Sequence, residues 1–304
     1  MHDHAHHGHA HDPHDHHAHI DAAGLGAFRW STLLNVLLVI LQAGVGLAIG
    51  SIALVADAGH NLSDVLGLLL AWGAARLAQR APSARHTYGY ARSTILAALL
   101  NAALLVAACG ALAFESARRL ADPSPVPGLV VAGVATLALL VNAGSAALFW
   151  RRRERDLNAR AAFLHLAADA AVSLGVIVAG GVIWATGWRW VDPATGLVVS
   201  VAIFVSAWRL MREALALALD AVPRGVELGA IREALLSVAS VRSVHDLHVW
   251  PLSTTVTALT AHLEHDGTRA GDAVLADAQH VLGERFAIRH TTIQLEDAGC
   301  GQAC

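Results

Sequence analysis

The chain has 304 residues, of which 55% are hydrophobic and only 15% are charged, and its mean hydropathy is +0.51. So apolar a composition excludes an ordinary soluble protein of this size, and a formal net charge of -3 without a basic face argues against nucleic-acid binding. A bilayer-spanning helix needs about 20 mostly apolar residues, and the first two thirds of the chain contains several such runs. We therefore predict a membrane protein with a globular C-terminal third.

The N-terminal segment is rich in histidine. Residues 1–19 contain ten histidines mixed with Asp, Ala and Gly, and they show no apolar periodicity. Such a segment is predicted to be disordered without metal and able to bind several ions loosely. We predict a His-rich tail over residues 1–27, a transmembrane domain over 28–216 and a cytoplasmic domain over 217–304.

Six apolar runs bounded by Gly, Pro or Arg predict an all-α membrane bundle. The spanning helices are expected near 30–50, 52–78, 93–117, 127–149, 162–186 and 191–213. Arginines gather at the second and fourth connections, at positions 76, 80, 85, 92, 151, 152, 153, 155 and 160. By the positive-inside rule, both termini are predicted to be cytoplasmic.

From Val222 onward the periodicity changes to that of a small α+β domain. Helices are expected at 227–239 and 270–284, and strands at 243–250, 254–263 and 290–296. The order αββαβ suggests an open sheet with helices on one face, as in metallochaperone-like domains. Because about 80 residues can just sustain a core, pairing with a second copy is expected to help.

A repeated polar pair stands inside the apolar helices. His60 and Asp64 are four residues apart in the second helix, and His165 and Asp169 have the same spacing in the fifth. Residues four apart share one helical face, and ionisable groups at membrane depth usually line an ion or proton pathway. A single pair is explained equally well by an intrahelical hydrogen bond, but two copies favour a shared metal site. Two imidazoles and two carboxylates suit tetrahedral Zn²⁺, with Co²⁺ and Cd²⁺ left open, and suit Mg²⁺ poorly.

Asp57 lies one turn before His60 on a similar face. It is a candidate proton acceptor or auxiliary ligand. The interpretation that we favour is a polar residue near the helix end that lines an aqueous vestibule.

Several segments resemble the cation diffusion facilitator family, and in particular its zinc-exporting bacterial members related to the vertebrate zinc transporters. The segments are SIALVADAGHNLSD at 51–64, RHTYG at 85–89, LHLAAD at 164–169, VHDLHVW at 244–250, AHLE at 261–264 and HTTIQLE at 290–296. Together they cover nearly the whole chain.

The resemblance implies a homodimeric antiporter in the bacterial cytoplasmic membrane rather than an enzyme. Each protomer is expected to hold Zn²⁺, its substrate, between the second and fifth helices and to exchange it for protons. Metal binding requires neutral imidazole and ionised carboxylate, which couples capture of the ion to proton release. Further Zn²⁺ is expected as a regulatory ligand of the cytoplasmic domain, and no organic cofactor is implied.

The resemblance also implies candidate residues outside the membrane. In the cytoplasmic domain, His245, His262 and Glu296 match metal-binding positions, with His248 and His290 as neighbouring candidates. Gln294 stands where some relatives have His, so fewer ions are expected there. In a regular strand, moreover, His245 and His248 would face opposite sides, one toward the core and one toward solvent.

Two weaker matches lie near the membrane surface. In the loop after the second helix only His86 matches a family metal site, since Ser83 and Tyr90 occupy the other positions. Arg92 and Asp220 match a charged clasp of some relatives, although a solvated surface pair is the alternative.

Two other function classes remain to be separated by experiment. An iron oxidoreductase of the histidine-box type needs many histidines at helix ends, and the predicted membrane helices hold only His60 and His165. A metal sensor or inactive partner subunit would bind without transport, which flux measurements distinguish. The terminal Cys300 and Cys304 are equally compatible with an inert tail and a metal contact.

Overall fold

The structure is a computed structural model that describes residues 22–150 and 157–297. The histidines of 1–19, the arginines of 151–155 and the cysteines at 300 and 304 lie outside the described residues. The six long helices are α1 (Ala22–Ile49), α2 (Ile52–Ala78), α3 (Ser93–Ala121), α4 (Gly128–Phe149), α5 (Leu157–Thr186) and α6 (Val191–Ala218). Helices α2 to α6 are long and apolar enough to cross a membrane, and α1 contributes a shorter apolar segment, Leu33–Ile49. The predicted six-helix bundle is confirmed.

Four helices are longer than predicted. Helices α1 and α5 begin before residues 30 and 162, and α3 and α6 continue beyond 117 and 213. The added segments are rich in Ala, Leu and Arg, which are strong helix formers. Charged residues therefore end the apolar segment without ending the helix.

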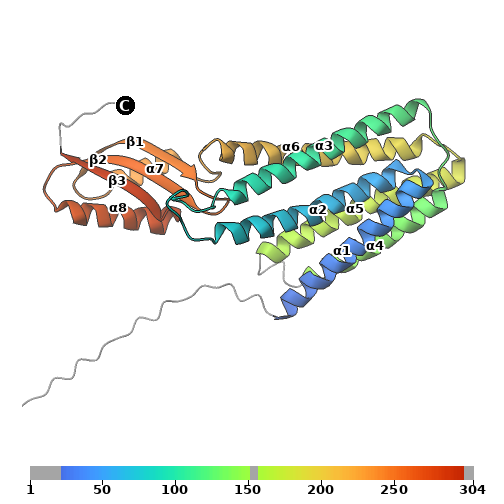
Figure 1. Cartoon of the computed structure of the whole chain (residues 1–304), viewed down its shortest axis with the longest axis horizontal. Coiled ribbons are helices and arrows are strands. Elements are labelled where there is room, and N and C mark those ends of the chain that lie inside the picture. Colours follow the sequence, from blue (N-terminus) through green and yellow to red (C-terminus); the bar gives the residue numbers. More distant parts are fainter. Residues whose placement is uncertain (1–21, 151–156, 298–304) are drawn as a thin grey trace, which may run out of the picture.

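The helices divide into two groups (Figure 1). Helices α3 and α6 lie side by side, while α1, α2, α4 and α5 form the other group. Helices α4 and α5 approach closely because glycines meet at their contact, where a Cβ atom on Gly180 would lie 2.7 Å from the Ala132 amide nitrogen. At the end remote from the C-terminal domain, the Asp192 carboxylate of α6 accepts hydrogen bonds from the Ser51 hydroxyl and the Ile52 amide at the start of α2.

The C-terminal domain has the predicted αββαβ order. It consists of α7 (Leu228–Leu236), β1 (Val241–Pro251), β2 (Thr257–His265), α8 (Gly271–Phe286) and β3 (His290–Asp297). Strand β2 is central, antiparallel to β1 and parallel to β3. Leu259 and Leu263 of β2 join the core formed with α7 and α8, so the alternate residue His262 faces the other side of the sheet.

Candidate metal centres

The four intramembrane candidates converge on one point between α2 and α5. Nε2 of His60 lies 3.3 Å from Oδ1 of Asp169 and 3.7 Å from Oδ2 of Asp64. Nε2 of His165 lies 3.3 Å from Oδ2 of Asp64 and 3.6 Å from Oδ2 of Asp169. Each imidazole thus faces both carboxylates, one from its own helix and one from the other.

These distances suit a tetrahedral cation. Two atoms that each lie about 2.0–2.1 Å from Zn²⁺ at the tetrahedral angle are about 3.4 Å apart. Atoms of His60, Asp64 and Asp169 form a group within 4.8 Å of one another, and His165 reaches both carboxylates from the side. The Asp169 side chain is 6% exposed and that of His165 is 48% exposed, so the group is buried on one side and open on the other.

Asp57 does not line an aqueous vestibule, contrary to the interpretation favoured from the sequence. It is 1% exposed, because α1 covers it and places Gln42 against it. The Gln42 side-chain amide donates to Oδ2 of Asp57 at 2.5 Å, and Asn61 in turn donates to Oε1 of Gln42 at 3.3 Å. Asp57 therefore belongs to a buried polar chain that joins α1 to α2.

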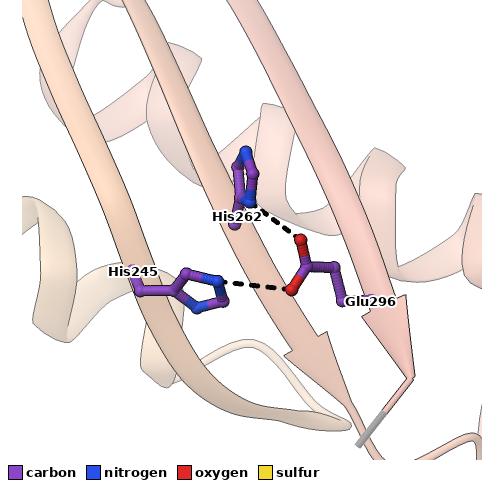
Figure 2. Close-up of side chains that lie close together, drawn as sticks. All are labelled: His245, His262 and Glu296. Carbon is purple, nitrogen blue, oxygen red and sulfur yellow. Dashed lines mark ion pairs between the residues drawn. The ribbon is translucent and has the colours of Figure 1, made fainter. Parts of the chain in front are cut away.

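A second group lies on the open face of the C-terminal sheet and draws one residue from each strand (Figure 2). The carboxylate of Glu296, on edge strand β3, faces both His245 of β1 and His262 of β2, with nitrogen-to-oxygen distances of 3.2 and 2.8 Å. Gln294 donates to Oε1 of Glu296 at 2.8 Å, so it supports the carboxylate without offering an imidazole. His245, His262 and Glu296 form the other group in the described chain that could hold a metal ion.

The strand geometry brings His245 and His248 to the same side, unlike the alternation expected of a regular strand. His245 pairs with His262 but His248 pairs with Thr260, so β1 has one extra residue in a bulge between them. Asp246 occupies this bulge at a positive φ of 46°. Its carboxylate lies 2.7 Å from Nε2 of His248 and 3.5 Å from Nε2 of His262.

Asp246 was missed by sequence reasoning. The hydrogen bond from His248 holds the pKa of the Asp246 carboxyl below its usual value. His248 thus contacts Asp246 rather than Glu296, and the arrangement adds a carboxylate beside His262. The acidic residue between two histidines in VHDLHVW is a signal, but its orientation depends on the bulge.

Two predicted candidates lie away from these groups. His290 begins β3, where it pairs with Ala258, and Glu296 lies six positions further along the strand, at a distance of roughly 20 Å. Its ring instead contacts Tyr88 of the α2–α3 loop at 5.4 Å between centroids. His86 stacks on Tyr90 at 4.7 Å and belongs to neither metal-binding group in the described part of the chain. Among the described residues, therefore, neither histidine belongs to a group that could hold a metal ion, and a site at either one stays a prediction.

Arg92 and Asp220, far apart in sequence, form an ion pair of 2.7 Å between the start of α3 and the end of α6. Both side chains are about half exposed, with relative accessibilities of 53% and 47%. The pair joins the two helices where they approach the C-terminal domain, and its action as a clasp stays a prediction.

A bundle of apolar helices with a partly buried His–Asp group, attached to an α+β domain whose sheet carries a second group that could hold a metal ion, is typical of a multi-pass membrane cation transporter. Residues 29–217 match the cation efflux transmembrane domain, and residues 223–298 match the cytoplasmic domain of cation efflux proteins. The chain belongs to this family, the cation diffusion facilitators.

Relatives match over most of their length. The chain is 36% identical to the zinc transporter ZitB of Shigella flexneri, over 84% of this chain and 82% of the relative. It is 30% identical to a cadmium, cobalt and zinc/H(+)-K(+) antiporter of Bacillus velezensis, over 85% and 84% of the two chains. Among solved structures, the metal-bound C-terminal domain of the CzcD transporter from Cuprividus metallidurans matches with 35% identity and a TM-score of 0.23, covering 23% of this chain and 99% of that domain.

Proposed function

We propose that this chain exports Zn²⁺ from the cytoplasm in exchange for protons. The observation that carries the proposal is the convergence of His60, Asp64, His165 and Asp169. Their nitrogen-to-oxygen distances are 3.3 Å between the two helices and 3.6–3.7 Å within each helix. A relative named as a zinc transporter supports the metal, and one named as an antiporter supports the exchange. Transport by this route needs no catalytic step and no organic cofactor.

Proton coupling follows from the chemistry of the four ligands. A neutral imidazole and an ionised carboxylate bind the cation, so its arrival displaces protons and its departure allows them to return. The arginine bias favours cytoplasmic termini in a bacterial inner membrane, and protons that enter the cytoplasm in exchange drive the cation outward. We expect the helices to rearrange so that the site opens to the cytoplasm and to the outside in turn, and never to both at once.

The C-terminal group is proposed as a regulatory metal site in a homodimer. His245, His262 and Glu296 bring two imidazoles and a carboxylate together, and Asp246 supplies a further oxygen beside them. This ion would remain bound while others are transported, since the group lies on a sheet outside the membrane bundle. Cd²⁺ and Co²⁺ are candidate alternative substrates, by analogy with the named antiporter.

Zinc uptake into inverted proteoliposomes with an imposed pH gradient tests the proposal. We expect wild-type flux to follow the gradient and Asp169→Ala to abolish it. Asp277→Ala is the matched control, because it removes an exposed carboxylate of α8 that pairs with Arg269. Flux that ignored the pH gradient would refute the exchange, and normal flux in Asp169→Ala would refute the site.

A further inference from the structure

His60 presents only one of its two ring nitrogens to the transport site. Nε2 faces the carboxylates of Asp64 and Asp169, whereas Nδ1 is buried and has no hydrogen-bond partner among the described residues. When Nε2 gives its lone pair to a cation, the proton of neutral imidazole resides on Nδ1. Metal-binding histidines almost always donate that proton to a carboxylate, a carbonyl or a water.

Asp57 offers an acceptor of this kind. It precedes His60 by three residues on α2, and residues at this spacing are neighbours on a helix, with Cβ atoms about 5–6 Å apart. Its Oδ2 accepts from Gln42, while Oδ1 is buried and has no hydrogen-bond partner in the described chain. Two unpaired polar atoms, one donor and one acceptor, therefore lie one turn apart on the same helix.

The remaining polar chain holds Asp57 in one orientation. Asn61 donates to the carbonyl oxygen of Gln42, which turns the Gln42 amino group toward Asp57. All three side chains are at most 4% exposed. A carboxylate held in an apolar bundle by a single side-chain donor is expensive, and such groups usually serve the ion pathway.

We infer that Asp57 is a positioning residue for His60, and that its Oδ1 accepts the Nδ1 proton either directly or through one water. This contact fixes the imidazole tautomer that leaves Nε2 free for the cation, and Gln42 and Asn61 keep the carboxylate in place. The inference rests on the proposed function, since it takes His60 as a ligand of the transported ion.

Zinc titration calorimetry of the full chain in nanodiscs tests it. The reference chain and every variant carry Glu296→Gln and the same His-rich segment. Heat from zinc bound elsewhere is then common to all of them, and differences in the heat report the membrane site. Asp57→Asn is expected to weaken zinc binding about 10- to 100-fold, the usual effect of losing a partner of a metal-binding histidine. Gln42→Leu is expected to weaken it less, and Ser116→Ala, which removes a buried hydroxyl of α3, is the control for loss of a buried polar group. Unchanged affinity in Asp57→Asn would overturn the inference.

A double-mutant cycle separates positioning from structure. His60→Asp replaces the ring with a carboxylate that has no proton to donate. The loss of zinc affinity caused by Asp57→Asn should therefore be at least about tenfold smaller in the His60→Asp background than in the chain with His60. The loss of one negative charge is common to both backgrounds and cancels in the cycle. Equal losses in both backgrounds would overturn the inference. An unchanged zinc affinity in the Asp169→Ala variant would instead contradict the proposed function.

Discussion

The membrane group and the sheet group both combine imidazoles with carboxylates, but the backbone brings their side chains together in different ways. In the membrane, two helices each supply a His and an Asp four residues apart, so each pair is set by local helix geometry. On the sheet, three strands each supply one residue, so the group exists only through strand pairing. The first site sits at a contact between two helices, whereas the second belongs to a hydrogen-bonded sheet. This difference favours transport at the first site and stationary binding at the second.

The largest expected contrast comes from removing one imidazole in each region. His165→Ala should lower zinc flux at least about 100-fold. Removing a hydrogen-bond partner of a metal-binding histidine typically lowers activity about 10- to 100-fold, and removing the ligand itself should have a larger effect. His262→Ala should leave flux at saturating zinc within about threefold of wild type, because its ion is not transported. Proteoliposome uptake at equal protein density measures both. If both variants lost a similar fraction of zinc flux, the proposed distinction between a transport site and a stationary site would be wrong.

The next contrast concerns metal removal from the C-terminal domain. An ion at 100 times its dissociation constant stabilises a folded domain by about 2.7 kcal/mol, so zinc should raise the domain's melting temperature and a chelator should reverse this. Glu296→Gln should abolish the zinc-dependent shift. Glu264→Gln is the matched control, since Glu264 bonds to the Ser243 hydroxyl outside the metal-binding group. If zinc still raised the melting temperature of the Glu296→Gln variant, the ion would be bound at another site.

A smaller effect is expected from crowding the scaffold of the membrane site. Gly180→Ala should destabilise the bundle by about 1–3 kcal/mol, because the new Cβ would lie 2.7 Å from the Ala132 amide nitrogen and 2.8 Å from the Gly128 carbonyl oxygen. Gly181→Ala is the neighbouring control, since no atom lies within 4 Å of its Cβ position. Thermal unfolding in detergent compares the two. Equal melting temperatures would show that α4 and α5 do not need this close approach.

The smallest expected effect concerns pH and the C-terminal fold. Hydrogen bonds from the Thr268 hydroxyl and amide, together with Arg242, hold the pKa of Asp266 well below its usual value. Its contribution to stability is therefore complete above the unfolded pKa of about 3.9 and is lost as pH falls through the lower folded pKa. Asp266→Asn should slightly lower the melting temperature at neutral pH, and the difference from wild type should vanish in strong acid. A difference that did not change with pH would contradict this assignment.

Sequence reasoning worked where structure is local and failed where it depends on pairing. The apolar runs predicted all six helices, and the repeated four-residue spacing predicted the faces of His60 and His165. The strand alternation suggested opposite faces for His245 and His248, but a bulge at Asp246 turns both to one side. His290 shares a motif with Glu296, yet an extended strand separates them along its length.

The amino-acid sequence by itself determined the membrane class, the helix order and the two His–Asp pairs, because hydropathy and helical periodicity act over a few neighbouring residues. Only the tertiary structure decided that α1 buries Asp57 beneath Gln42, that the Asp246 carboxylate lies beside His262, and that His290 lies away from Glu296. Those outcomes depend on which segments pack together, and long-range packing and strand register leave no fixed spacing along the chain.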